Sequence, residues 1–352
     1  MSDFVSALVS VVIPVPDRAR WLPAAVQSAL AQRHPQVEVL LCDDGSTDGT
    51  ERTIDELAAR APDRIRVLHL PPRGPGPARE AGRLASRGEF IQYLDSDDLL
   101  LPEKFSLQIA ALRARPECGI AYGITRLVDE RGRILVDPFK WTGREIPRLF
   151  PGLLVDRWWC THTPLYRRET CDRIGPWSDL RYSQDWEYDA RAGALAMPLA
   201  FVNQPVSHHR QHAGVRQTQG GRWLAPPDQI RFFRALWAGA LAAGVSGEAP
   251  ETKHFVRWTF AAARAAARAG DGASAAELLA LAESAAPGPA RALRIYRRLS
   301  ERLGWRAVAA GAEKLRKMRP RRFGRDTLPK SWMVSDRNDA PGSADAAEKP
   351  PC

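Results

Sequence analysis

Short apolar runs that lead into acidic residues constrain the fold of this chain more than any other feature. The expected strands are residues 9–13, 37–42, 65–70 and 89–94. Residues 22–32 and 78–86, which lie between them, have the pattern of helices. Strands that alternate with helices in short steps indicate βαβ units and a parallel sheet. We therefore predict an α/β fold with a mostly parallel sheet flanked by helices.

Acidic residues gather where these strands end. They are Asp17 after the first strand, Asp43 and Asp44 after the second, and Asp95, Asp97 and Asp98 after the fourth. In a parallel sheet the carboxyl ends of the strands lie along one edge, and ligands bind beyond it. A single acid after a strand usually caps a helix or a turn, but two acid clusters at corresponding strand ends favour a binding site.

The Asp95-x-Asp97 spacing is typical of a site for a hard cation. Mg²⁺ and Mn²⁺ bind carboxylate oxygens together with the phosphates of a substrate. A calcium loop or a two-metal nuclease also gathers acids, but the Gly and Glu of an EF-hand do not occur at the required spacing. Helix capping is the alternative role for Asp97. We predict that Asp97 is a metal ligand.

The pattern changes in the second half of the chain. The expected elements are a helix at 103–115, strands at 119–128, 133–136, 160–168 and 199–203, and a helix that begins at Gln184 or Asp185. The first and second of these strands, at 119–128 and 133–136, read as a hairpin, so this half is expected to extend the sheet in a mixed or antiparallel way. His208 and His209, which follow the last strand, are expected at the surface. After about residue 221 the chain becomes rich in alanine and is expected to be helical.

The net charge of +10 comes from one segment. Residues 291–325 contain thirteen Lys or Arg and two Glu, a net charge of +11, which leaves about −1 for the rest of the chain. A solvated helical face is the default interpretation of such a segment. Peripheral binding to an anionic membrane is the functional alternative. Nucleic-acid binding is not expected, because no recognition motif accompanies the charge.

The compartment is expected to be the cytoplasm, and the membrane alternative for the basic segment would place it on the inner face of the membrane. The N-terminus lacks a basic n-region and a small-residue cleavage site, and no run approaches the roughly 18 apolar residues of a membrane span. The five cysteines lie far apart without a CxxC spacing, so we expect buried thiols and neither a disulfide framework nor a zinc site.

Three stretches together resemble glycosyltransferase family 2. They are VSVVIPVPDRARWLPAAVQSALAQ, VEVLLCDDGSTDGT and RGPGPAREAGRLASRGEFIQYLDSDDLLLPEKF. The resemblance covers residues 8–115 strongly and extends weakly to about 220. It implies the GT-A fold, a Rossmann-like sheet joined to an acceptor-binding half, here with a helical C-terminal extension. It also implies inverting transfer of a sugar from a nucleotide donor, expected to be UDP-linked, to a hydroxyl of a glycan or lipid-linked acceptor of the cell envelope.

The resemblance assigns the donor site to motif residues. Those expected to bind the nucleotide sugar are Pro14, Val15, Pro16, Asp17, Asp43, Asp44, Arg79, Asp95 and Ser96. Within this set Asp44 is expected to contact the base, Arg79 to lie near the nucleotide, and Asp95 to contact the ribose or the waters of the metal. Asp97 matches the direct ligand of Mn²⁺ or Mg²⁺, with His212 as a further metal or phosphate contact.

The resemblance also assigns residues of the second half. Asp185, in YSQDWEYDAR, matches the catalytic base, which takes the proton of the acceptor hydroxyl. Trp186 and Arg210 are expected to contact the acceptor or the diphosphate. Trp158, Trp159 and Trp177 are further candidates for stacking on a sugar, against the alternative of a core position.

The expected regions follow from these motifs. They are a nucleotide-sugar and metal-binding half at 1–105, an acceptor-binding half at 106–221, a helical region at 222–323 and a disordered tail at 324–352.

Some positions depart from the family pattern. Pro16 and Asp17 replace an aromatic residue and Asn, Glu80 replaces Asn, and Gln184 replaces the Glu that usually precedes the base. A catalytically silent nucleotide-sugar-binding protein of the same fold is therefore one alternative. A nucleotidyltransferase is another, although no glycine follows the first strand as those enzymes require.

Overall fold

Strand β1 (Val9–Val15) forms the middle of a parallel group of strands. It pairs in parallel with β2 (Val37–Asp43) on one side and with β4 (Phe90–Tyr93) on the other. All seven of its residues are buried, as expected for a parallel strand covered on both faces. The structure is a computed structural model that describes residues 7–17, 19–212, 225–288 and 290–318.

The sheet is mixed outside this parallel group. Its order within the described residues is β3-β2-β1-β4-β8-β6-β9-β5, with β7 paired to β6. The other strands are β3 (Ile65–His69), β5 (Leu99–Leu100), β6 (Ile120–Val128), β7 (Ile134–Val136), β8 (Leu165–Arg167) and β9 (Leu199–Arg210). Strands β6 and β7 form the predicted antiparallel hairpin, and β8 is antiparallel to both β4 and β6. The predicted α/β class and mixed extension are confirmed.

Two predictions about strands were wrong. Only Leu165–Arg167 of the expected strand at 160–168 is a strand, and residues 160–164 form the turn before it. Strand β9 continues to Arg210, so His208 and His209 belong to the sheet and do not follow it. The polar sequence of residues 207–210 hid this continuation, because Ser207, His209 and Arg210 hydrogen-bond to Thr125, Asp98 and the carbonyl of Asp97.

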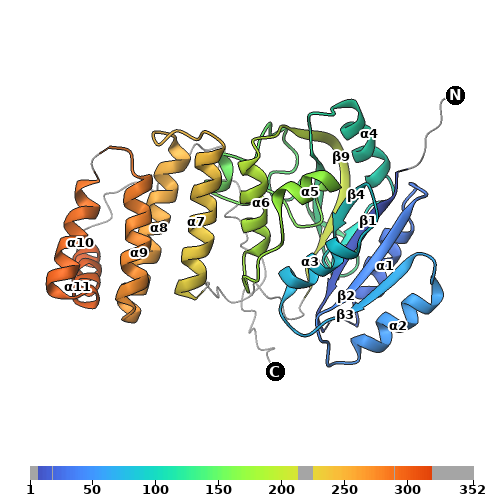
Figure 1. The fold of residues 1–352 in the computed structure, drawn as a ribbon, viewed down its shortest axis with the longest axis horizontal. Helices are drawn as coiled ribbons and strands as arrows, with labels where there is room; N and C mark the ends of the chain where they lie inside the picture. Colours follow the sequence, from blue (N-terminus) through green and yellow to red (C-terminus); the bar gives the residue numbers. More distant parts are fainter. Residues whose placement is uncertain (1–6, 18, 213–224, 289, 319–352) are drawn as a thin grey trace, which may run out of the picture. The chain divides into compact units, whose positions relative to one another are not determined.

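Helices cover the sheet (Figure 1). In this part of the chain they are α1 (Leu22–Leu30), α2 (Thr50–Arg60), α3 (Pro75–Ala85), α4 (Lys104–Ala114), η1 (Gly152–Leu154), α5 (Arg168–Ile174) and α6 (Gln184–Ala194). Helix α3 lies very close to β1 and β2, because a Cβ on Gly82 would lie 2.4 Å from Val12 Cγ1 and 2.7 Å from Cys42 Sγ. This close contact fixes the helix that carries Arg79 against the strands that carry the acids.

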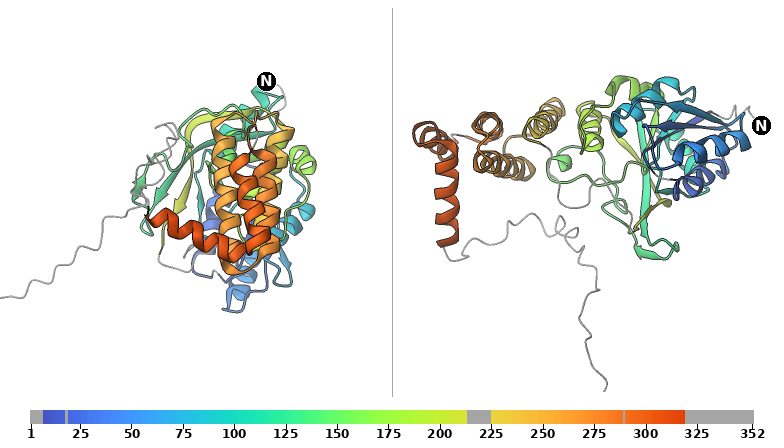
Figure 2. Two further views of the ribbon diagram at one scale, coloured as in Figure 1. Left: turned by 90° about the vertical axis from the view of Figure 1, so that its left-hand side faces the viewer. Right: turned by 90° about the horizontal axis from the view of Figure 1, so that it is seen from below.

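The predicted helical region continues from α6 as a row of helices (Figure 1, Figure 2). The row consists of α7 (Pro226–Ala242), α8 (Pro250–Ala269), α9 (Gly272–Ala285) and α10 (Arg291–Leu303). A further helix, α11 (Trp305–Met318), follows α10 in the chain. Helix α7 packs on α6, and the row then continues through contacts of α9 with α7, α8 and α10. Contacts divide the chain into one unit up to Ala310 and a second from Gly311 onward.

The remaining predictions concern the C-terminal tail, the cysteines and membrane spans. The predicted tail at 324–352 and the end of the basic segment lie outside the described residues. Cys42, Cys118, Cys160 and Cys171 are buried free thiols, as predicted. Among the described helices, none combines the length and hydrophobicity that are needed to cross a bilayer.

Candidate functional site

The acids at the end of β2 lie beside the end of β1. The register pairs Val15 with Asp43, so the last residues of the two strands are level. Asp43 Oδ1 accepts a hydrogen bond from Ser46 N (3.0 Å), and its Oδ2 lies 3.1 Å from His69 Nδ1. Burial alone would raise the pKa of Asp43, but these hydrogen bonds hold the pKa below its usual value. Asp43 therefore stays ionised and orders the turn behind it.

Asp44 fixes a second loop at the same edge. Its carboxylate accepts hydrogen bonds from the backbone amides of Arg73 (2.8 Å) and Gly74 (2.9 Å). Burial raises the pKa of Asp44 above its usual value. Gly45 allows the close approach of this loop, because its φ is 74° and a Cβ there would lie 2.8 Å from Pro72 Cδ. The Asp-Asp-Gly motif thus holds two loops at the carboxyl edge.

The residues at the end of β1 and directly after it differ in their exposure. Pro14 and Val15 are buried within the strand, Pro16 is half-buried and Asp17 is exposed. Asp17 Oδ1 accepts a hydrogen bond from Thr47 N at 2.7 Å, which connects the loops that follow β1 and β2.

Arg79 joins helix α3 to the acids after β4. Its Nη2 donates to Asp95 Oδ1 at 2.5 Å, and its guanidinium lies 4.9 Å from the centre of the Trp177 ring. Only 5% of its side chain is exposed, yet Nε and Nη1 have no hydrogen-bond partner. Buried polar atoms nearly always have a partner. Two unsatisfied donors on a buried cation therefore suggest that an anionic ligand binds here.

Asp97 is held by the end of β9. Its Oδ2 lies 3.0 Å from His212 Nε2, and its carbonyl oxygen accepts a hydrogen bond from Arg210 Nε at 2.5 Å. The His212 ring stacks on Trp21, with the ring centres 4.7 Å apart. The structure thus places Asp97 beside Arg210 and His212, which follow it by more than a hundred residues in the sequence. Ser96, between the two acids, is buried.

These residues fit a divalent cation. Asp97 offers carboxylate oxygen beside the imidazole nitrogen of His212, and Asp95 is the neighbouring carboxylate. Carboxylate oxygens suit Mg²⁺ and Mn²⁺. The potential metal-ligand atoms of Asp95, Asp98 and His162 also lie within 4.8 Å of one another.

Asp185 lies in the first turn of α6 and pairs with a buried arginine. Arg157 Nη1 donates to Asp185 Oδ2 at 2.7 Å, and Arg157 Nε donates to Asp189 Oδ2 at 2.6 Å. Although burial would raise it, the charges of Arg157 and then Arg79 hold the pKa of Asp185 below its usual value. Its side chain is 29% exposed, whereas that of Asp189 is 1% exposed. Asp185 is thus an ionised carboxylate that is partly exposed to solvent.

Three of the four tryptophans that were candidates for contacting a sugar or the acceptor belong to the core. Trp158, Trp159 and Trp177 are nearly fully buried, and the Trp177 ring stacks on Tyr188. Trp186 is half-buried, donates from Nε1 to the carbonyl of Leu153, and packs against Trp258 of α8.

Sequence reasoning missed several residues of the site. Arg157, Asp189 and His162 have no recognisable motif, because their partners are distant in sequence. His209 was expected at the surface and this prediction was wrong, since its Nδ1 lies 3.1 Å from the buried Asp98. The run of three acids at 95–98 was the only signal that could have identified Asp98.

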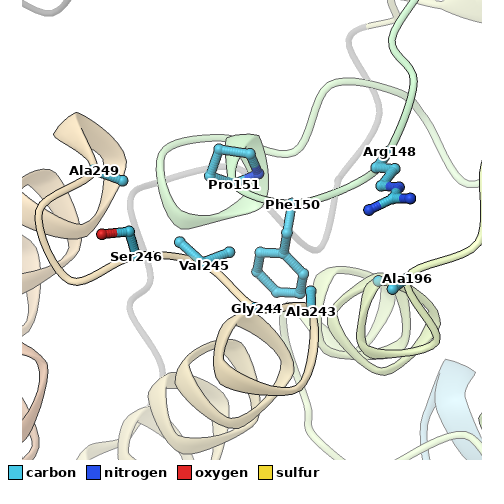
Figure 3. A pocket seen from close by; sticks show the side chains of 10 residues that line it. Arg148, Phe150, Pro151, Ala196, Ala243, Gly244, Val245, Ser246 and Ala249 are labelled. Carbon is cyan, nitrogen blue, oxygen red and sulfur yellow. The ribbon is translucent and has the colours of Figure 1, made fainter.

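The described surface is hollowed beside the end of β9 and beside the turn between α7 and α8. A cleft of about 750 Å³ between the β6–β7 turn and the end of β9 is lined by Arg131, Arg133 and Leu135 and reaches His212. A smaller cavity of about 300 Å³ lies where the loop at Arg148–Pro151 meets the turn between α7 and α8 (Figure 3). None of the acids described above lines this second cavity.

Known proteins resemble the chain in sequence. The profile described as Glycosyl transferase family 2 matches residues 10–174. An uncharacterised glycosyltransferase of Nostoc sp. is 28% identical over 179 residues, which are 49% of this chain and 55% of that protein. Chondroitin synthase of Escherichia coli is 34% identical over 134 residues, 38% of this chain and 19% of that enzyme. The chain thus matches about half of the first relative's length and a fifth of the second's.

A solved structure extends the likeness to most of the fold. Residues 1–349 of S. aureus TarS, in complex with UDP-GlcNAc, superimpose with a TM-score of 0.65. The two chains are 17% identical, and the match covers 90% of this chain and 94% of that one. The predicted GT-A fold is confirmed by this likeness. The strand-end acids lie within residues 10–174, the part of the chain that is similar to glycosyltransferase family 2.

Proposed function

We propose that this chain is an inverting glycosyltransferase that moves a sugar from a nucleotide donor to a hydroxyl of a glycan or lipid-linked acceptor. The observation that supports this most is the position of Arg79 between the two acidic parts of the site. Arg79 pairs with Asp95, and its charge also lowers the pKa of Asp185. Its unsatisfied Nε and Nη1 provide donors for an anionic leaving group.

A single displacement needs a base for the acceptor and a positive charge near the leaving group, and different residues supply them. Asp185 takes the proton of the acceptor hydroxyl as the oxygen attacks the anomeric carbon. The bond to the nucleoside diphosphate breaks on the opposite face, and Arg79 stabilises the charge that develops there. One displacement inverts the anomeric configuration. The low pKa of Asp185 keeps the base ionised before the acceptor binds.

We assign a divalent cation, Mn²⁺ or Mg²⁺, to Asp97, with His212 and Asp95 beside it. The cation would neutralise the diphosphate, which is the chemistry that it supplies when bound. Arg210 of β9 binds the carbonyl of Asp97 and His212 binds its carboxylate, so the carboxylate is positioned without the cation.

A UDP-linked sugar is the first donor to test. TarS, which shares the fold, binds UDP-GlcNAc. A thermal-shift panel of nucleotide sugars should identify the donor, because a ligand that binds only the folded state raises its apparent stability. A catalytically silent binding protein would show the same stabilisation, and donor hydrolysis with Mn²⁺ separates the two hypotheses.

The Asp97→Asn variant tests the enzyme proposal. We expect it to lose donor hydrolysis and the Mn²⁺-dependent stabilisation by UDP, while its circular dichroism stays that of the unmodified chain. Asp63→Asn changes an exposed acid outside the site and is the matched control. Normal turnover in EDTA, or normal turnover of Asp97→Asn, would contradict metal-assisted transfer.

We also propose that α10 contacts anionic lipid. Its outer face carries an apolar stripe, Ile295, Leu299 and Leu303, with exposed fractions of 58%, 44% and 64%. Four exposed arginines follow one side of this stripe: Arg291, Arg294, Arg298 and Arg302. Apolar side chains beside basic ones are typical of helices that lie in a membrane interface. Each arginine near an anionic surface contributes about 1 kcal/mol.

Vesicle pelleting tests the lipid proposal. We expect binding to phosphatidylglycerol vesicles at low salt, release at high salt, and loss of binding when Ile295, Leu299 and Leu303 are changed to Ser. Strand β7 offers a matched control, because Ile134, Leu135 and Val136 are also exposed. Changing these three to Ser should leave binding intact. Equal pelleting with phosphatidylcholine, or no pelleting, would leave α10 as a solvated face.

A further inference from the structure

A second group of potential metal ligands lies beside the strand-end acids. Cys160 and His162 come from the turn before β8, and His209 comes from β9. The Sγ of Cys160 and one ring nitrogen of each histidine lie within 4.8 Å of one another. Cys160 and His162 are buried, and His209 is partly exposed, so a small ion could enter past His209.

The carboxylate of Asp98 lies between the two histidines. Its Oδ2 is 2.8 Å from His162 Nδ1 and 3.1 Å from His209 Nδ1. The two rings are nearly parallel, with an angle of 9° between their planes. Histidines that bind a metal usually donate their other ring nitrogen to a carboxylate, which fixes the ring and its tautomer. Asp98 is placed to do this for both rings.

His162 has a buried ring nitrogen without a partner. Its side chain is fully buried, Nδ1 lies 2.8 Å from Asp98 Oδ2, and Nε2 has no hydrogen-bond partner among the described residues. A buried polar nitrogen without a partner is unfavourable, because it has left water without replacing its hydrogen bond. A ligand bound by Nε2 would remove this cost.

We propose that Cys160, His162 and His209 bind one zinc ion and that Asp98 orients the two histidines. Thiolate and imidazole are ligands that favour zinc over Mg²⁺ or Mn²⁺, whereas Asp97 and Asp95 offer hard oxygen. Bond lengths of about 2.3 Å to sulfur and 2.0–2.1 Å to nitrogen require the ligand atoms to move together by about 1 Å. The fourth position of a tetrahedral ion is left for water.

A zinc ion at this position would stabilise the loop that carries Asp97. Asp98 is the next residue, and it also accepts a hydrogen bond from Arg210 N at 2.9 Å. The ion would join the turn before β8 to β9 and, through Asp98, to the loop after β4. This role is structural and does not depend on the transfer reaction.

Metal analysis of the full chain tests the proposal. The chain is purified without a histidine tag, incubated with ZnCl₂ and desalted. We expect one zinc ion per chain, and loss of this ion in Cys160→Ser. Cys171→Ser, which changes a buried thiol outside the group, should keep the ion. Asp97→Asn should keep it too, and loss of zinc in that variant would place the ion at Asp97 and His212 instead.

Cobalt spectroscopy of the unmodified chain provides a measurement that needs no variant to fold. Co²⁺ bound by Cys160 should give a thiolate-to-cobalt charge-transfer absorption that Zn²⁺ abolishes. If the chain retains no zinc, or if Cys160→Ser folds and retains as much zinc as the unmodified chain, the proposal is wrong. The four side chains would then be a hydrogen-bonded group around Asp98.

Discussion

The acids at the strand ends and the acids of α6 are held in different ways. Asp43 and Asp44 accept hydrogen bonds from backbone amides of nearby loops. Asp185 and Asp189 instead share the side chain of Arg157. Asp189 accepts further hydrogen bonds from Trp159 Nε1 at 2.9 Å and Tyr166 OH at 3.3 Å.

This difference determines how each group responds to mutation. A backbone amide remains when its residue is replaced, so the strand-end acids depend on a short local motif. Asp185 and Asp189 depend on the buried charge of Arg157, and an unpaired buried charge is destabilising. Mutations at the strand ends should therefore change ligand affinity, whereas mutations around Arg157 should change the pH dependence of the reaction.

The largest effect is expected for Asp185→Asn. If Asp185 is the base, turnover should fall by about 10²- to 10⁴-fold, the usual contribution of general-base catalysis. UDP affinity should stay unchanged, because the variant loses an interaction needed only for chemistry. Steady-state kinetics and calorimetric titration with UDP measure the two quantities. Asp179→Asn, which changes an acid on the exposed surface of the same half, is the control.

Weakened UDP binding with normal turnover of Asp185→Asn would contradict this assignment. It would show that Asp185 belongs to the donor site or supports the fold.

The next effect concerns the pH dependence of kcat/KM. Arg157, Arg79 and Lys140 lower the pKa of Asp185, and Asp189 is the negative charge beside them. Because the base must be ionised, activity is lost as the pH falls through its pKa. Arg157→Met removes a positive charge, so the acidic limb should move to higher pH. Asp189→Asn removes a negative charge, so the limb should move to lower pH.

Opposite shifts distinguish an electrostatic role from a structural one. If Arg157 only supports the fold, both variants would lower the activity at every pH without moving the limb. Circular dichroism at each pH is the control, since removing one partner of a buried pair can cost about 3–5 kcal/mol of stability.

The sequence predicted the parallel part of the fold because that part is encoded locally. The apolar residues of β1 and β2 are buried on both faces, and this produces runs that are visible without any alignment. The pairing of β6 with β9 was not predicted, since the two strands are parallel and more than seventy residues apart. The end of β9 was missed because its polar residues face partners inside the site.

The difference between local motifs and contacts of distant residues applies to the site as well. Asp95, Asp97 and Arg79 stand in local motifs, and the structure shows a hydrogen bond from Arg79 to Asp95. Arg157 could not be identified, because its two partners lie about thirty residues further along and no spacing relates them. The group of Cys160, His162 and His209 was not identified for the same reason, and the absence of CxxC spacing had led us to expect no zinc site.

The smallest effect is expected at Asp44, where backbone amides carry the interaction. Asp44→Ala removes the acceptor for Arg73 N and Gly74 N and frees the loop that precedes Arg79. Water can replace much of this contact, because the Arg73 amide lies at the surface. We therefore expect UDP affinity to fall about tenfold, which corresponds to about 1.4 kcal/mol, with kcat little changed. Asp44→Asn keeps one acceptor and should lose less.

The nucleotide dependence of this loss identifies what Asp44 does. The two amides engage both carboxylate oxygens, so we expect calorimetry to show similar losses for UDP and GDP. This result would mean that Asp44 acts by holding the loop. A loss confined to UDP would show instead that the carboxylate contacts the base directly, and Asp44 would then determine nucleotide specificity even though it resembles Asp43 in its backbone contacts.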